Sequence, residues 1–262
     1  MRFFKLCICS LASHAALGLR MNNGPEGVET EAEIDEMDLL VFRTMHDEHP
    51  AFYEGIGKHV NDTVLREKIT ALKAKSRGGG MMEQEYFHFM AYVRDHAPQN
   101  LLVWGLGYDS VLLNALNEGG RTVFLEMNAT WVRNTDAAAL EYYSYDDGTF
   151  KTTVDTASEF VKHPHRAELT VLDKMPCWDT ILVDSPLGVR RENVGRGVPI
   201  YTAKSDLERC IANHKYKPGQ QLAVFVHDNN RFAEDLFTKA FLGEPVSQIG
   251  PKKLREFHFS AA

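Results

Sequence analysis

The chain has 262 residues, of which 44% are hydrophobic and 25% charged, and its formal net charge is −7. This length fits one large α/β domain with a small addition, and the ordinary composition excludes a low-complexity or collagen-like protein. The negative charge argues against a nucleic-acid partner, because such proteins usually carry a basic surface.

The first twenty residues, MRFFKLCICSLASHAALGLR, have the order of a secretory signal. Arg2 and Lys5 precede a short apolar core that ends among small residues. The core is too short for a comfortable membrane span, so we expect no stable span in the mature chain. Residues 1–20 are therefore predicted as a signal or targeting segment, with a signal anchor or a buried helix as alternatives. The acidic residues 21–35 are predicted as a linker.

Amphipathic helices are predicted next, because apolar side chains recur at three- and four-residue spacing from residue 36 onwards. The run RGGG at 77–80 interrupts this pattern, and a further helix is predicted over 81–95. Residues 36–98 thus form a predicted N-terminal helical section, and residues 99–262 form a second section, in which strand and helix patterns alternate.

The stretch NLLVWGLGYDSVLLNAL, residues 100–116, joins an apolar run to a helical pattern through Gly-x-Gly. Gly105 and Gly107 let the backbone approach a ligand where a Cβ would clash. The helix expected from Asp109 directs N–H groups at that ligand. Ser110, a further candidate contact, stands where a dinucleotide fingerprint has its third glycine. The turn fits a nicotinamide dinucleotide or S-adenosylmethionine, and a tight turn without a ligand is the alternative.

Glu126 ends the next predicted strand, RTVFLEM. A carboxylate at this position accepts hydrogen bonds from two ribose hydroxyls. Both cofactor classes contain ribose, so Glu126 predicts a ribose without choosing between them. A solvated strand end is the alternative interpretation.

Strands and helices alternate through the rest of the chain, which predicts a parallel sheet with helices on both faces. Helices are expected over 129–140, 153–161, 203–213 and 232–242, and strands over 141–147, 179–188 and 221–230. Residues 244–260 predict two strands with a Gly-Pro turn, and this closing hairpin adds an antiparallel strand to the sheet.

Polar side chains follow two later strands, where open α/β sheets keep their chemistry. Asp184 follows TILV, and Asp228 and Asn229 follow LAVFVH. Two carboxylates and an amide predict a site for Mg²⁺, Mn²⁺ or Co²⁺, which would lower the pKa of a bound substrate hydroxyl. His227 is the alternative, as a general base for that hydroxyl. Turn capping by the aspartates and a structural histidine remain open.

A basic segment, SPLGVRRENVGRGVPIYTAK, follows Asp184 and is predicted as a loop over the site. Guanidinium groups bind carboxylates with two parallel hydrogen bonds, so Arg190 and Arg196 are candidate ligands of a uronic acid. A solvated basic loop is the alternative, particularly for Arg190 and Arg191.

The chain has four cysteines, and their spacing predicts neither a zinc site nor a disulfide-rich scaffold. Cys7 and Cys9 lie in the predicted targeting segment. We expect Cys177 and Cys210 to be two buried thiols, with a disulfide between them as the alternative.

Four segments together resemble a plant polysaccharide-biosynthesis family, the domain of unknown function 579. They are NLLVWGLGYDSVLLNALNEGGRTVFLEMNATWV, WDTILVDSPLG, GRG at 195–197 and VFVHDNNR. The family's best-known members are glucuronoxylan 4-O-methyltransferases. The resemblance runs from about Asn100 to Phe259 and implies a Rossmann-like class I methyltransferase fold, dependent on S-adenosylmethionine, for residues 99–262.

The resemblance also implies methyl transfer to the 4-hydroxyl of glucuronic acid in a glycan, within the Golgi lumen. By motif, the residues implied for the methyl donor are Gly105, Gly107, Asp109 and Glu126, and those for the acceptor side are Asp184, Arg196, His227 and Asp228. A weaker likeness to catechol O-methyltransferases makes Asn229 a candidate metal ligand. A small-molecule acceptor, or a non-catalytic member acting in polysaccharide deposition, is the alternative.

Overall fold

The computed structural model describes residues 55–76, 80–128, 140–145, 152–175, 177–188 and 193–261. All of them belong to one unit, Glu36–Ala262, which is described here by itself. The predicted targeting segment, the predicted linker and most of the helix expected over 129–140 lie outside the described residues.

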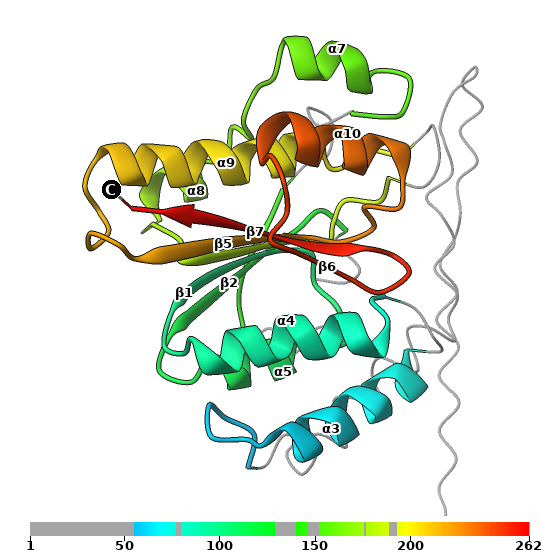
Figure 1. The fold of residues 1–262 in the computed structure, drawn as a ribbon, viewed down its shortest axis with the longest axis vertical. Helices are drawn as coiled ribbons and strands as arrows, with labels where there is room; N and C mark the ends of the chain where they lie inside the picture. Colours follow the sequence, from blue (N-terminus) through cyan, green and yellow to red (C-terminus); the bar gives the residue numbers. More distant parts are fainter. Residues whose placement is uncertain are drawn as a thin grey trace, which may run out of the picture. The chain divides into compact units, whose positions relative to one another are not determined.

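A seven-stranded sheet forms the centre of this unit, in the order β3-β2-β1-β4-β5-β7-β6 (Figure 1). Its strands are β1 (Asn100–Trp104), β2 (Arg121–Glu126), β3 (Glu141–Ser144), β4 (Thr180–Val183), β5 (Gln221–Val226), β6 (Ser247–Ile249) and β7 (Leu254–Ser260). The first five strands are parallel, whereas β7 pairs antiparallel with both β5 and β6. The predicted parallel sheet with a closing hairpin is therefore confirmed.

Helices cover both faces of the sheet (Figure 1). The helices on one side are α3 (Asp62–Lys75), α4 (Glu83–Asp95) and α5 (Ser110–Leu116), and those on the other are α7 (Ala157–Lys162), α8 (Thr170–Lys174), α9 (Gly197–Ala212) and α10 (Phe232–Phe241). Helix α4 packs on the sheet, and α3 packs on α4. The N-terminal helices thus share a core with the sheet.

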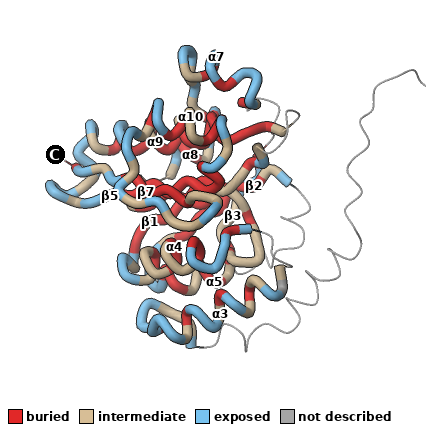
Figure 2. Tube along the Cα trace, turned by 45° about the vertical axis from the view of Figure 1, so that its right-hand side comes forward, coloured by how far each residue is buried: buried red, intermediate tan, exposed pale blue. Residues whose placement is uncertain are grey.

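Two hydrophobic cores lie on the two faces of the sheet, because successive side chains of a strand point to opposite sides. Leu101 and Val103 of β1 join the core under α4 and α5, whereas Leu102 and Trp104 join the core under α9 and α10. The central strands are buried on both faces (Figure 2). Each such buried side chain contributes about 1.5–3 kcal/mol to folding, which fixes the strand ends that carry the polar residues.

Helix α9 begins at Gly197, six residues before the helix expected over 203–213. The sequence GVP suggests a loop, but proline is tolerated in the first turn of a helix, where backbone N–H groups have no helical partner. The predicted loop over the site is therefore shorter and ends at Arg196, the N-cap of α9. The five-residue helix α8 was not predicted either.

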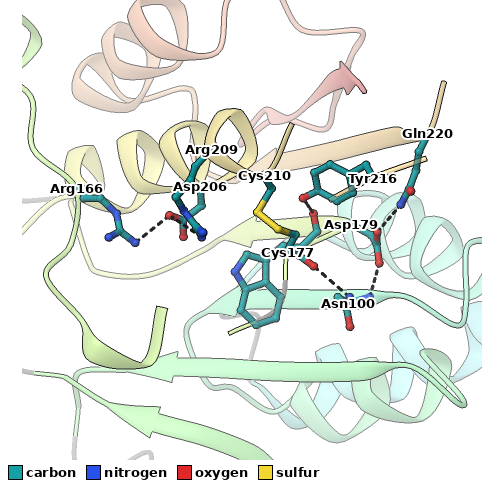
Figure 3. Close-up of a disulfide and its surroundings, with 10 residues drawn as sticks. Asn100, Arg166, Cys177, Asp179, Asp206, Arg209, Cys210, Tyr216 and Gln220 are labelled. Carbon is teal, nitrogen blue, oxygen red and sulfur yellow. Dashed lines mark hydrogen bonds and ion pairs between the residues drawn. A yellow bond between two sulfur atoms is a disulfide. The ribbon is translucent and has the colours of Figure 1, made fainter. Parts of the chain in front are cut away.

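Cys177 and Cys210 form a disulfide, so the expectation of two free thiols is wrong (Figure 3). Cys177 lies just before β4 and Cys210 is buried in the last turn of α9, with their Cα atoms 5.9 Å apart. The start of β4 is also held by Asp179, which accepts the backbone N–H of Asn100 at 2.7 Å. The bond therefore joins one end of α9 to the edge of the sheet that lies opposite the predicted site.

Replacing both bonded cysteines by serine is expected to lower the free energy of unfolding by about 2–4 kcal/mol, because the bond restricts the unfolded chain. The two cysteines are 33 positions apart in the sequence, which makes this entropic effect substantial. Urea unfolding without reductant would measure it. Reductant should lower the wild-type midpoint and leave that of the double variant unchanged, and an equal midpoint for reduced and oxidised wild type would contradict the prediction.

Candidate active site

The glycine turn after β1 brings two strand ends into contact. Gly105 has φ +119°, and a Cβ added there would lie 3.0 Å from the Cβ of Ser185, just after β4. Its N–H donates to the carbonyl of Leu125 in β2 at 2.8 Å. Only glycine fits this backbone and this space, so the turn after β1 can pack closely against the end of β4.

Ser110 and Asp109 lie directly after this turn. Ser110 is buried, and its hydroxyl accepts the N–H of Gly107 at 2.9 Å, so it stabilises the turn from within. Asp109 is half-buried, and burial together with the nearby charge of Asp184 raises its pKa to about 7. Of these two residues predicted to bind the methyl donor, Ser110 therefore shapes the turn, and Asp109 places a carboxyl group near Asp184.

Glu126 closes the other side of the turn, with an exposed fraction of 3%. Its Oε2 accepts the N–H of Leu106 at 2.8 Å, and its Oε1 accepts the N–H of Asn128 at 2.7 Å. Burial raises the pKa of Glu126, although these backbone N–H groups work in the opposite direction. Each oxygen of a carboxylate has a second lone pair, so both remain chemically able to accept a ribose hydroxyl.

Asp184, His227 and Asp228 meet at the carboxyl ends of β4 and β5. Their ligand atoms all lie within 4.8 Å of one another. His227 Nδ1 lies 2.7 Å from Asp184 Oδ1 and 3.4 Å from Asp228 Oδ2. The structure thus brings together the three predicted catalytic residues, here called the strand-end cluster, in a partly buried site.

His227 carries a positive charge in this cluster at neutral pH. Burial alone would lower the pKa of His227, but Asp184 and the neighbouring carboxylates Glu85 and Asp228 outweigh it and raise the value to about 9. An imidazolium ion has no free lone pair with which to take a proton. The geometry therefore favours His227 as a fixed charge that orients Asp184 rather than as a general base.

Glu85, which the sequence did not single out, is the other neighbour of His227. It is fully buried in the first turn of α4, and its Oε2 lies 3.3 Å from His227 Nε2, an ion-pair distance without hydrogen-bond alignment. Its oxygens accept the N–H groups of Met82 at 2.7 Å and Lys252 at 3.0 Å. Glu85 therefore connects α4, the β6–β7 turn and the strand-end cluster.

Arg196 lies beneath the cluster with only 2% of its surface exposed. Its guanidinium group donates to the backbone carbonyls of Asp184, Pro186 and His227 at 2.5–3.0 Å. It also lies 3.0 Å from Asp228 Oδ2. These contacts favour a structural role for Arg196 at the strand ends. Its contact with a uronate stays a prediction, and this geometry does not favour it.

Asn229, a predicted metal ligand, is directed into the fold. Its amide nitrogen donates to the carbonyl of Val226 at 2.6 Å, and its Oδ1 accepts the hydroxyl of Thr238 in α10 at 2.9 Å. The side chain therefore anchors α10 to β5, and both of its polar atoms already have partners.

The strand-end cluster does not fit a divalent ion as it is folded. Arg196 and Arg231 place guanidinium nitrogens 3.0 and 2.8 Å from Asp228 Oδ2. His227 Nδ1 lies 2.7 Å from Asp184 Oδ1, so this carboxylate oxygen also has a partner. Mg²⁺, Mn²⁺ or Co²⁺ would have to displace these positive groups, because a metal needs lone pairs where the cluster has N–H donors.

Arg190, the other predicted substrate contact, lies outside the described residues.

Solved methyltransferase structures show a distant likeness. A methyltransferase-like protein of Silicibacter pomeroyi aligns with a TM-score of 0.38 and 14% identity, over 70% of this chain and 88% of that one. A putative S-adenosylmethionine-dependent methyltransferase of Streptococcus mutans aligns with a TM-score of 0.34 and 10% identity, over 90% of this chain and 83% of that one.

Sequence relatives are more similar. Glucuronoxylan 4-O-methyltransferase 1 of Arabidopsis thaliana is 36% identical over 62% of this chain and 61% of its own length. Arabinogalactan O-methyltransferase 2 of the same plant is 30% identical over 64% of this chain and 62% of its own length. The matched region thus spans less than two thirds of these relatives. The family model IRX15/IRX15L/GXM matches residues 84–177 and 171–257. The resemblance expected from the motifs is therefore confirmed, and the chain belongs to the IRX15/IRX15L/GXM family.

Proposed function

We propose that the chain is an S-adenosylmethionine-dependent O-methyltransferase that acts on a polysaccharide, at the 4-hydroxyl of glucuronic acid in a glucuronoxylan-like glycan. The juxtaposition of Glu126 and the glycine turn with Asp184 at the neighbouring strand end carries this proposal. In this arrangement Glu126 would bind a ribose and Asp184 would accept a proton, at the same edge of the sheet. Membership of a family whose relatives are named for glycan O-methylation supports the acceptor class.

S-adenosylmethionine supplies an electrophilic methyl group, which the acceptor oxygen takes in line as the bond from that carbon to sulfur breaks. The residues that would hold the donor are Gly105, Gly107 and Glu126, with Ser110 shaping the turn. Asp109, whose pKa lies near 7, borders the reacting groups. Holding both reactants in line and excluding water would provide most of the rate.

Asp184 is the group that receives the acceptor's proton in this proposal. Its Oδ1 is held by His227, whereas its Oδ2 accepts no hydrogen bond from any residue that the structure describes. Burial would raise the pKa of Asp184, but the charges of His227 and Arg196 lower it, so Asp184 is ionised at neutral pH. It would take the proton that the hydroxyl loses as its oxygen bonds to the methyl carbon, because the hydroxyl then becomes strongly acidic. No step passes through a metal ion.

The cellular setting that we propose is the secretory pathway, in the Golgi lumen. The Cys177–Cys210 disulfide supports it, because such bonds persist in oxidising compartments. The glycans in the names of the relatives, glucuronoxylan and arabinogalactan, are consistent with that setting. Within the described ranges, no helix has the length and apolar character that crossing a membrane requires.

Calorimetric titration with S-adenosylmethionine, and separately with NAD, tests the donor site. We expect binding of S-adenosylmethionine alone, and Glu126→Ala should weaken it by about 1–3 kcal/mol because two ribose hydrogen bonds are lost. Glu126→Gln retains one acceptor oxygen and should lose less. Equal donor affinity in wild type and Glu126→Ala would remove the proposed ribose contact, and NAD binding would overturn the cofactor class.

Methyl transfer from labelled S-adenosylmethionine tests the acceptor. Xylo-oligosaccharides that carry glucuronic acid should become labelled, and the same oligosaccharides without the uronic acid should not. Labelling of a small hydroxylated acceptor alone would favour the small-molecule alternative. Donor binding without any transfer would favour a non-catalytic member of the family.

A further inference from the structure

Two large apolar side chains lie exposed beside the strand-end cluster. Leu187 has 64% of its surface exposed and Phe232 has 63%, although most apolar side chains among the described residues are buried. Leu187 follows Asp184 by three positions in the chain. Phe232 opens α10 directly after Arg231, whose guanidinium group lies 2.8 Å from Asp228.

The segments that carry these side chains pack on each other. A Cβ added to Gly188, the residue after Leu187, would clash with Oε1 of Glu234 in the first turn of α10. The carbonyl of Leu187 also accepts the N–H of Gly195 at 2.8 Å, next to Arg196 in the chain. Leu187 and Phe232 therefore flank the same strand ends from two adjoining segments.

Their chemistry differs from that of the buried site. The aspartate and histidine side chains of the strand-end cluster bind one another and Arg196, whereas an exposed aromatic ring offers a flat apolar surface in contact with water. Single exposed apolar side chains are ordinary, but these two stand on adjoining segments at the candidate site, where apolar side chains can bind a ligand. A pyranose ring has C–H faces that pack on an aromatic ring and hydroxyl edges that bind polar groups, so it suits this combination.

We propose that Phe232, with Leu187 on the adjoining segment, forms a platform on which a sugar ring of the acceptor glycan packs. This inference rests on the proposed glycan O-methyltransferase activity, and it names the residues that select an oligosaccharide over a small acceptor. Phe232 would contribute to acceptor binding and leave the chemical step and the donor site unaffected.

Calorimetric binding of glucuronic-acid-bearing xylo-oligosaccharides to the full chain tests the platform, with S-adenosylhomocysteine present so that no turnover occurs. Phe232→Ala should weaken binding by about tenfold, and Phe232→Trp should keep it within about threefold of wild type, because the larger ring preserves the flat surface. The matched control is Val246→Ala, since Val246 is 57% exposed and lies before β6. It should bind as wild type does.

The outcomes separate the platform from the proposed activity. If wild type binds the oligosaccharide without methylating it, and Phe232→Ala still weakens binding, the platform stands and the proposed activity fails. If methylation occurs but Phe232→Ala binds and reacts as Val246→Ala does, the platform is overturned and the activity stands. Failure of wild type to bind any of these oligosaccharides would also overturn the platform.

Discussion

Asp184→Asn is expected to lower kcat for methyl transfer by roughly 10²–10⁴-fold, the usual contribution of a positioned proton acceptor. Asparagine has nearly the same shape and its carbonyl oxygen can still accept the proton of His227 Nδ1, now 2.7 Å from Asp184 Oδ1. The amide cannot take a proton from the acceptor hydroxyl at neutral pH. The affinity for S-adenosylmethionine should stay within about threefold of wild type, because Glu126 and the glycine turn remain intact.

Single-turnover rates and calorimetry on the same preparations would measure both quantities. Asp173→Asn is a suitable control, since its side chain is 62% exposed and pairs with Arg166 beside α8. It should react at the wild-type rate. An Asp184→Asn variant with a wild-type kcat would exclude Asp184 as the proton acceptor, and a large loss of donor affinity would place its role in donor binding instead.

The sheet was predictable because its strands are short apolar runs that alternate with helical patterns. Residues 121–126 are apolar except at the ends and just after Arg121, as expected of a central strand buried on both faces. The start of α9 was not predictable from local pattern, because Gly197 and Pro199 resemble loop residues. Its helical start depends on Thr152, which lies far away in the sequence. The hydroxyl of Thr152 accepts the N–H of Gly197 at 2.9 Å.

The strand-end cluster was predictable in its members but not in its electrostatics. Parallel strands place their carboxyl ends at one edge of the sheet, so Asp184 and Asp228 were expected there, and the pairing of β4 with β5 makes them neighbours. Glu85 carried only a local signal, its place three residues after the Met82 N-cap of α4, whose backbone N–H it accepts. Its contact with His227 depends on the packing of α4 against the sheet. Burial lowers the pKa of His227, and Asp184 first, then Glu85 and Asp228, raise it; spacing along the chain does not reveal which effect is larger.

The disulfide illustrates the same limit. Cys177 and Cys210 lie in separate elements, and a spacing without C-x-x-C gives no indication that they meet. Their contact arises because α9 runs back over the sheet from the carboxyl edge to the start of β4 (Figure 1). Once this direction is known, the last turn of α9 must lie above Cys177.

Arg196→Ala is expected to lower the free energy of unfolding by about 3–5 kcal/mol, the usual cost of removing one partner of a buried ion pair. The truncation would leave Asp228 without one of its two guanidinium partners, and three backbone carbonyls without a donor. Arg196→Lys keeps the charge but loses the planar fork, so it should recover only part of the loss. Urea unfolding of the ligand-free chain measures these changes.

Arg209→Ala provides the control for this substitution. The Arg209 side chain is 42% exposed and lies 3.7 Å from Asp206, so its removal should change the free energy of unfolding by less than about 1 kcal/mol. If Arg196 binds the uronate instead, the result would be the opposite. Arg196→Ala would unfold at the wild-type urea concentration, and only the affinity for uronic-acid-bearing oligosaccharides would fall. That result would restore the acceptor contact predicted from the sequence, because the buried contacts of Arg196 would then contribute little to folding.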